Sequence, residues 1–363
     1  MRGRVRGGAA ITAVLLAGLT GCGGGGGGNS SVPAPTYTVT DLGTVQNNGV
    51  ARRINDAGLA VGYAGENAAA PRAFVVRGGR EAARDLPLPK NTNASVAYGV
   101  NDAGQVTGSA ITSVGATERA FVFDEPTGAL TQLPSLPDGQ DRAEARAVSS
   151  TGQMVVGSAF TGQSFSGPGV GTPAFPIFHA VMWQNGAIRD LGTLGGQAGE
   201  FGYATDVNDA GQIVGTSGLR AFLYQNNKMT ALGGDETSAE AVNGRGDVAG
   251  SDRDQAVVWL AGSGERRLGK LNNNPTRAWD INDAGAVVGE ATTAAAASNY
   301  AGSRAFLYVA GGRLMDLNRQ IPANSGWTLN AALGINNRGQ IVGVGTVNGV
   351  QRAFLLTPVV PAP

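Results

Sequence analysis

Residues 204–215 read ATDVNDAGQIVG, and close copies of this stretch recur along the chain. Each copy has an Ala, two variable positions, a β-branched residue and an Asn or Ser, followed by a turn with Gly and a short apolar run. Because Gly adopts positive φ at little cost between two strand-like runs, each copy predicts a β-hairpin. The copies begin with residues 51–55, 97–101, 145–149, 204–208, 239–243, 278–282 and 332–336.

Two further patterns follow each hairpin. The first is an Ala that is usually preceded by Arg and followed by Phe, as in Arg220-Ala221-Phe222, and it predicts a third strand. The second is centred on a leucine and predicts a fourth strand; the leucines are Leu42, Leu86, Leu133, Leu191, Leu232, Leu268 and Leu317. The mature chain is therefore predicted to hold seven units of four short strands each.

The spacing of the units favours a β-propeller. Their Asn or Ser positions are 55, 101, 149, 208, 243, 282 and 336, so the units average roughly forty to fifty residues, as four-stranded propeller blades do. Residues 221–224 and 305–308 are apolar at consecutive positions, which indicates strands that are covered on both faces.

The two ends of the repeat region complete one unit. It opens at 37–43 with a fourth-strand pattern and ends at 352–356 with a third-strand pattern. A ring that closes by pairing its terminal strands leaves no exposed sheet edge. We therefore predict an all-β fold, a single seven-bladed β-propeller over residues 36–359 with a tail at 360–363; the alternative is an open β-repeat array.

The first 35 residues predict an export and anchoring signal. Arg2, Arg4 and Arg6 precede a short apolar stretch at 9–19, as in a signal peptide over residues 1–21. The sequence LTGC at 19–22 resembles the bacterial lipobox, which implies lipidation of Cys22, with residues 22–35 as a Gly-rich tether. We expect secretion across the inner membrane and lipid anchoring at the bacterial outer membrane or cell surface. An ordinary secretory signal with an unrelated cysteine is the alternative.

Composition argues against several classes of function. Lys and Arg number 27 and Asp and Glu also number 27, so the chain lacks the basic excess typical of nucleic-acid binding. A single cysteine cannot build a disulfide framework. We expect a monomer without nucleic acid or cofactor, whose partners are the membrane, through the lipid anchor, and a polysaccharide or a surface protein.

The repeat patterns also resemble a known family. INDAGxxVG at 281–289, the Arg-Ala-Phe or His-Ala-Val element and DLGTLGG at 190–196 are similar to the bacterial extracellular HAF-repeat family. The resemblance covers nearly the whole mature chain, although Arg mostly replaces the His of the family's name. It implies a surface repeat protein and little about activity.

Few residues suggest chemistry. His179 is the only histidine and occupies the position that holds Arg in most units, so we expect a structural role for it, with no metal site and no catalytic residue. Asp after the turn Asn occurs together with Arg before Ala-Phe, which predicts a structural Asp–Arg pair within each blade. These pairs are Asp56 with Arg72, Asp102 with Arg119, Asp209 with Arg220, and Asp283 with Arg304; calcium binding by the aspartates is the alternative.

Binding is predicted in the loops where units differ. The long insertion at 159–177, the insertion at 291–303 and the segment 321–329 carry aromatic side chains, with possible ligand contacts at Phe160, Phe165, Phe175, Phe178, Tyr300 and Trp327. We therefore predict a non-enzymatic, lipid-anchored surface propeller that binds an extracellular partner. The alternatives are a glycan-cleaving enzyme that uses two carboxylates, from among Glu66, Glu200, Asp235, Glu236, Glu240 and Glu290, and a purely structural envelope protein.

Overall fold

The computed structural model describes residues 36–43, 48–65, 70–78, 81–112, 118–166, 174–195, 200–292 and 300–359. All of them belong to one compact unit, Pro35–Pro363. Apart from the short 3-10 helix η1 (Leu317–Arg319), the regular structure of these residues is β. None of their helical structure is long and apolar enough to cross a membrane.

The strands form seven antiparallel four-stranded sheets, which we number as blades 1 to 7 from the first hairpin. The first strands are β2 (Val50–Ile54), β6 (Thr92–Val100), β10 (Ala143–Val148), β14 (Gly202–Val207), β18 (Thr237–Val242), β22 (Thr276–Ile281) and β26 (Trp327–Ile335). The second strands are β3 (Leu59–Ala64), β7 (Gln105–Thr112), β11 (Met154–Phe165), β15 (Ile213–Ser217), β19 (Val248–Asp252), β23 (Val287–Ala291) and β27 (Ile341–Val347). The third strands are β4 (Arg72–Arg77), β8 (Glu118–Asp124), β12 (Phe175–Gln184), β16 (Arg220–Gln225), β20 (Gln255–Leu260), β24 (Arg304–Tyr308) and β28 (Val350–Pro358). The outer strands are β5 (Arg84–Asp85), β9 (Ala129–Gln132), β13 (Ala187–Gly192), β17 (Lys228–Ala231), β21 (Gly264–Gly269), β25 (Leu314–Asp316) and β1 (Tyr37–Asp41).

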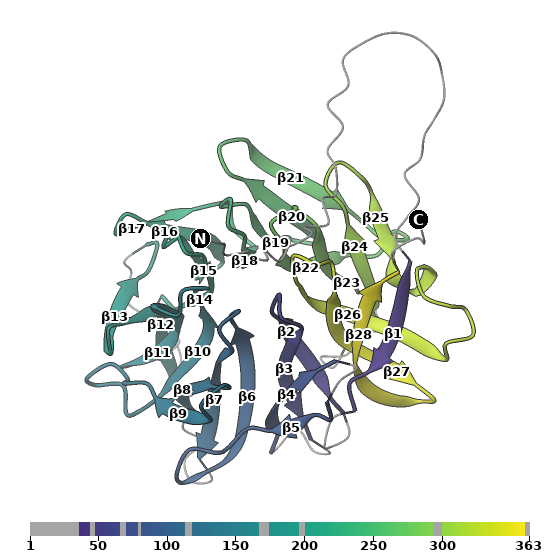
Figure 1. Cartoon of the computed structure of the whole chain (residues 1–363). Coiled ribbons are helices and arrows are strands. Elements are labelled where there is room, and N and C mark those ends of the chain that lie inside the picture. The colour runs from purple at the N-terminus through teal and green to yellow at the C-terminus, as the bar shows by residue number, and fades with distance from the viewer. Residues whose placement is uncertain are drawn as a thin grey trace, which may run out of the picture. The chain divides into compact units, whose positions relative to one another are not determined.

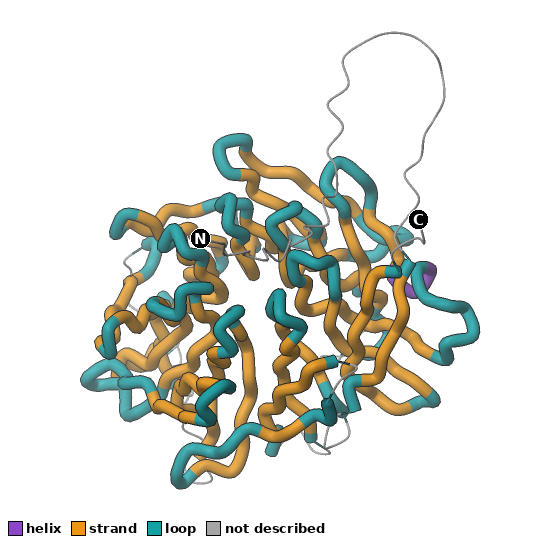
Figure 2. The backbone as a smooth tube through the Cα atoms, in the orientation of Figure 1, coloured by secondary structure: helices purple, strands orange, loops and turns teal. Residues whose placement is uncertain are grey.

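The blades stand around a central channel, with the first strands innermost (Figures 1 and 2). Each first strand contacts the first strands of both flanking blades, and β26 of blade 7 contacts β2 of blade 1. The ring is therefore closed, which confirms the predicted seven-bladed propeller over the open array.

Blade 7 joins the two ends of the chain. Its order is β1-β28-β27-β26, and β1 pairs antiparallel with β28 so that Val39 lies opposite Leu356. Tyr37 is buried in the apolar cluster of this blade, and its backbone N–H donates to the carbonyl of Gln320 at 2.8 Å. The closure predicted from the incomplete end units is present.

The core lies between blades rather than in one centre. In β24, Ala305 and Leu307 pack into the cluster shared with blade 7, whereas Phe306 and Tyr308 pack into the cluster shared with blade 5. Alternate side chains of one strand thus enter two different interfaces. This confirms that runs of consecutive apolar residues mark strands with both faces covered.

Every second strand carries a glycine where a side chain has no room. A Cβ on Gly215 would lie 2.1 Å from the carbonyl oxygen of Tyr203 and 2.9 Å from the ring of Phe222. A Cβ added to any of the equivalent glycines would likewise lie within 2.2 Å of a first-strand carbonyl oxygen. These glycines are Gly62, Gly108, Gly157, Gly250, Gly289 and Gly343. The apolar run therefore ends in Gly because the strand beside it and the third-strand ring approach too closely.

The hairpin turns form a hydrogen-bonded ring at one end of the channel. Asn282 accepts from the backbone N–H of Ala286 within its own turn and donates to the carbonyl of Asn336 in the next blade at 3.1 Å. The same donation to the next blade is made by Asn55, Asn101, Asn208, Asn243 and Asn336. In blade 3 the Asn is replaced by Ser149, and Ser150 instead donates to Asp209 of blade 4. The turn Asn thus joins the blades as well as shaping the hairpin.

Candidate functional site: the central channel

A β-bulge interrupts the first strand of every blade at the same place. The pairing with the second strand skips the residue after the repeat's Ala, for example between Ala278 and Asp280 in blade 6. The bulged residues are Arg52, Tyr98, Arg146, Thr205, Glu240, Trp279 and Leu333. A bulge leaves its residue unpaired and can redirect its side chain, and the seven bulged residues of the innermost strands are of six different types.

Five of the side chains around the channel form an alternating stack across four blades. The Arg52 guanidinium lies 5.7 Å from the ring centre of Tyr63 and 5.2 Å from that of Tyr98. Tyr98 also contacts Arg146, whose guanidinium lies 5.2 Å from the ring centre of Tyr98 and 5.7 Å from that of Tyr203. We call Tyr63, Arg52, Tyr98, Arg146 and Tyr203 the ladder. Cation–π contacts with two rings restrict the positions that each guanidinium can take.

Carboxylates and a tryptophan complete this end of the channel. Glu144 accepts from Arg146 at 3.1 Å, and Arg277 lies 5.2 Å from the ring centre of Trp279. Trp279 donates to Glu290 at 3.3 Å. Burial raises the pKa of Glu240, while Arg277 and Arg146 oppose that rise. Because Arg146 and Glu240 stand two blades apart, their interaction runs around the channel and not within one sheet.

Tyr300 lies against the same end of the channel. Its side chain packs near Tyr63 and Trp279, and burial raises its pKa. Its backbone φ is +65°, which is unfavourable for a bulky side chain. We call the channel end formed by the ladder, Glu240, Arg277, Trp279 and Tyr300 the ladder mouth.

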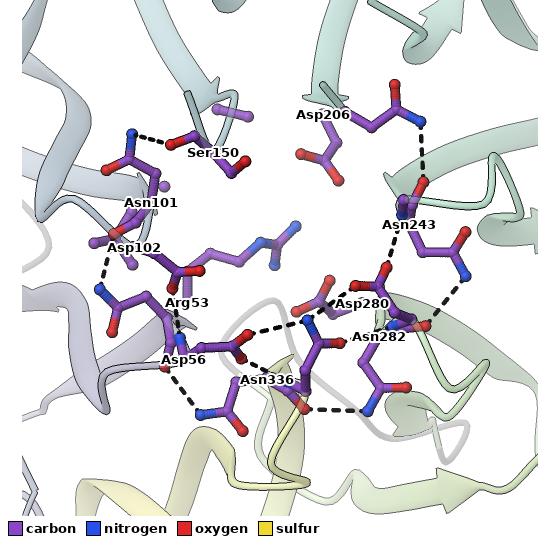
Figure 3. Close-up of a pocket in the computed structure, with 18 of the residues that line it drawn as sticks. Arg53, Asp56, Asn101, Asp102, Ser150, Asp206, Asn243, Asp280, Asn282 and Asn336 are labelled. Carbon is purple, nitrogen blue, oxygen red and sulfur yellow. Dashed lines mark hydrogen bonds between the residues drawn. The ribbon is translucent and has the colours of Figure 1, made fainter. Parts of the chain in front are cut away.

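The end of the channel at the turns is a polar pocket of about 260 Å³ (Figure 3). Arg53 reaches into it and donates to the carbonyl of Leu333 at 2.7 Å, with Asp206 and Asp280 across from it. Asp206 accepts from the backbone N–H groups of Val207 and Val242, and Asp280 accepts from those of Ile281 and Ile335. Each carboxylate therefore links two blades, which indicates a structural role for these charges.

Asp206 gives the stability of the ring a pH dependence. Burial raises its pKa to about 6 although Arg53 opposes the rise, so folding favours the neutral form. That stabilisation is complete below pH 4 and is lost as the pH rises through about 6. We expect the free energy of unfolding to fall by about 3 kcal/mol over this range from this group, measured by urea unfolding at several pH values. Asp206→Asn should flatten the profile, whereas Asp209→Asn should not, and equal slopes for both variants would contradict the assignment.

The predicted contact residues do not form one surface. Phe160 is buried, and its ring centre lies 5.8 Å from that of Phe178, with Arg142 over both rings. Phe165 and Phe175 face each other across β11 and β12 and are 49% and 63% exposed. Trp327 packs edge-on against Phe354 at 6.2 Å.

Of the six predicted contact residues, only Tyr300 lies at the ladder mouth, and Phe160 and Trp327 have structural contacts. Parts of the two insertions, residues 167–173 and 293–299, lie outside the described residues.

The Asp–Arg pairing predicted within blades is wrong. The turn aspartates instead accept from neighbouring turns, as Asp102 does from the N–H of Asp56 and Asp283 from the N–H of Gly244. Asp56 accepts from Asn337, and Asp209 accepts from Ser150 and Thr151.

The arginines lie at the other end of the second strand. Their contacts are Arg72 with the carbonyl of Leu86, Arg119 with Asp141, Arg220 with Asp235 and Arg304 with Asp316. The turn precedes the first residue of the second strand, whereas the Arg lies opposite a residue near the end of that strand, as Arg220 lies opposite Ser217. A strand of five or six residues spans ~17–20 Å, which is too far for an ion pair.

The structure describes His179 and five of the six candidate carboxylates, but not the residues of the predicted export signal. His179 shares the position of the arginines and lies 2.8 Å from Asp190 on the outer strand of its own blade, a contact similar to that of Arg304 with Asp316. The predicted signal peptide, the lipidation site Cys22, the tether and Glu66 lie outside the described residues. Of the loop carboxylates, Glu240 and Glu290 are at the ladder mouth, whereas Glu200, Asp235 and Glu236 contact Ser217, Arg220 and Arg253 elsewhere.

Apart from Glu240, Glu290 and Tyr300, the channel residues are not among the candidates predicted from the sequence, because the repeat pattern treats most of them as variable positions. The two residues between Ala and the β-branched residue differ from copy to copy. They are Arg52 and Arg53 in blade 1, but Trp279 and Asp280 in blade 6. A position that varies among copies that otherwise agree is not fixed by the shared hairpin, and this contrast marks it as a candidate for a role of its own.

Comparison with known proteins identifies the fold. No family model matches the chain, so membership of the HAF-repeat family stays a prediction. No curated protein matches it either. Among solved structures, one described as YCF48 bound to D1 peptide is similar over 91% of this chain and 97% of its own, at 10% identity and a TM-score of 0.53. The shared feature is the propeller.

Two other similar structures are enzymes by their names. An oligogalacturonate lyase from Vibrio parahaemolyticus matches 88% of this chain and 93% of its own, at 9% identity and a TM-score of 0.49. An acylaminoacyl peptidase from Pyrococcus horikoshii matches 86% of this chain, at 10% identity and a TM-score of 0.48, and this chain spans 53% of that protein's length. At these identities the activities in their names are not transferred to this chain.

Proposed function

We propose that this chain is a non-enzymatic, lipid-anchored surface protein that binds an extracellular partner, a polysaccharide or a protein, at the ladder mouth of its propeller. The observation that carries this is the set of bulged residues. The Ala before each bulge is the same in all seven blades, yet the bulged residues are Arg, Tyr, Arg, Thr, Glu, Trp and Leu.

Thr205 is hydrogen-bonded to the carbonyls of Val214 and Ala239, and Leu333 is buried in an apolar cluster. The other five bulged residues are poorly explained by folding alone. A ring needs small or apolar side chains where its innermost strands converge, and partly buried charges cost free energy unless they are fully paired. The mouth nevertheless gathers Arg52, Arg146, Arg277 and Glu240 with four tyrosines and a tryptophan. Rigid aromatic rings, arginines and fixed hydrogen-bonding groups on a stiff scaffold are typical of binding sites. A propeller similar in fold was solved with a bound peptide, which is consistent with such a role.

The lipid anchor in this proposal rests on the sequence LTGC at 19–22 and the apolar stretch before it. An anchored propeller on a Gly-rich tether would meet partners outside the inner membrane. Its location at the outer membrane or cell surface is part of the proposal.

A glycan-cleaving enzyme remains the second candidate because of two carboxylates. Glu240 and Glu290 both lie at the ladder mouth, and burial raises the pKa of each. A raised pKa suits a general acid, and paired carboxylates are what glycoside hydrolysis uses. Glu290 is held by Trp279, however, which favours a fixed hydrogen-bonding role.

Binding and cleavage can be separated in one experiment. The full chain in detergent is titrated against cell-envelope polysaccharides and surface-protein extracts, and the polysaccharides are assayed for new reducing ends. We expect saturable binding without cleavage, and we expect Trp279→Ala to weaken it at least about 10-fold because truncating a central aromatic residue commonly costs this much. Phe175→Ala, on an exposed hairpin away from the channel, is the matched control and should bind normally. New reducing ends that disappear in Glu240→Gln would establish the enzyme instead.

A further inference from the structure

Within the described part of the chain, Arg52 is a cation without a counter-charge. Its guanidinium lies 5.7 Å from the ring centre of Tyr63 and 5.2 Å from that of Tyr98, and its Nε is buried without a hydrogen-bond acceptor. Among the described residues no carboxylate lies within ion-pair distance of it. A half-buried guanidinium with free N–H groups is costly by itself, and an anion placed in its plane would relieve that cost.

The other two arginines of the mouth differ in this respect. Arg146 is paired with Glu144 at 3.1 Å. Arg277 lies close enough to Glu240 and Glu290 to oppose the rise in their pKa values. At this mouth, the charge of Arg52 lowers the pKa of two tyrosines, Tyr98 and Tyr300, against the rise that burial causes. The described acidic side chains at this end therefore lie along blades 2, 3, 5 and 6, with Glu118 beside Glu144, and Arg52 on blade 1 is left without one.

We propose that Arg52 binds the carboxylate of an acidic sugar residue, so that the partner at the ladder mouth is an acidic polysaccharide. This inference rests on the proposed binding function and specifies its ligand. The carboxylate would accept from the edge of the Arg52 guanidinium, which the stacked tyrosines hold in place.

The rest of the mouth favours a sugar over an acidic peptide. Glu240 and Glu290 offer acceptor oxygens, and the hydroxyls of Tyr63 and Tyr300 can both donate and accept. A uronic acid carries several hydroxyls on the same ring as its carboxylate, so one residue can donate to Glu240 or Glu290 while its anion faces Arg52. An acidic side chain of a peptide brings the anion without neighbouring hydroxyls.

The test compares a charged and an uncharged form of one ligand. The full chain in detergent is titrated calorimetrically with a tetrasaccharide of uronic acid and with its methyl ester, in which a methyl group neutralises each carboxylate. We expect the acid to bind about 10- to 100-fold more tightly than the ester, the range expected for a hydrogen bond to a charged group. Arg52→Gln should abolish this preference, so that the acid and the ester bind with equal affinity. Arg52→Lys should retain part of it, and Arg220→Gln, on an outer part of blade 4, should retain all of it.

The possible outcomes distinguish the ligand from the function. Equal affinity for acid and ester in the unaltered protein would overturn the inference. So would tighter, Arg52-dependent binding of a tetrapeptide of glutamate. Failure of both saccharides while a surface protein still binds in a Trp279-dependent way would overturn the inference but leave the proposed function standing. Failure of every partner at the mouth would remove both.

Discussion

Removing residues 1–41, and with them the closing strand β1, should destabilise the propeller by about 4 kcal/mol or more. The loss combines the backbone hydrogen bonds to β28 with the burial of Tyr37, one of the aromatic residues of the blade 7 cluster. The unpaired edge of β28 should also make the shortened protein aggregate, because an exposed, apolar strand edge recruits other strands. Urea unfolding and light scattering would measure the two effects.

The matched control for this truncation is a chain that begins at Pro35. It keeps all of β1 and removes only residues outside the compact unit Pro35–Pro363. We expect it to unfold at the urea concentration that unfolds the full chain. If the two shortened proteins were equally stable, strand pairing between the two ends would not be what closes the ring.

Gly215→Ala should cost about 3 kcal/mol of unfolding free energy. The new Cβ would sit 2.1 Å from a backbone carbonyl oxygen of the first strand and 2.9 Å from the Phe222 ring. Neither can retreat, since the strand is pinned between two blades and the ring is fully buried. Overfilling a packed site of this kind typically costs ~1–3 kcal/mol, and a backbone clash lies at the upper end.

Gly234→Ala controls for the general effect of replacing glycine. Gly234 is exposed, its backbone does not need positive φ, and nothing lies within 4 Å of an added Cβ. Thermal unfolding of the two variants should therefore differ by several degrees. A Gly215→Ala protein as stable as Gly234→Ala would show that the repeated glycine has another cause.

Much of the fold is predictable because each blade repeats the same local chemistry. The Gly of each turn has positive φ, as at Gly58 and Gly285, and this preference is local to the residue. Consecutive apolar residues in β24 pack into two interfaces, and an apolar run reveals that without knowledge of the partner blades. Ring closure followed from the incomplete units at both ends, since a missing strand and an extra strand of the same unit must meet.

The site was less predictable because it depends on contacts between blades. The sequence shows that Arg52, Tyr98 and Arg146 occupy equivalent positions about fifty residues apart, but it does not show that they stack. The predicted Asp–Arg pairs failed for a related reason, because co-occurrence within a unit says nothing about which end of a strand a residue occupies. Asp283 and Arg304 are separated by the length of β23.

By itself, therefore, the sequence determined the seven units, their four strands and the closure of the ring, since these depend on backbone preferences and on burial patterns within each unit. The tertiary structure alone decided what the variable residues do. A β-bulge in each first strand turns one of them out of the regular pairing, and the convergence of seven such strands brings together side chains that no single blade contains.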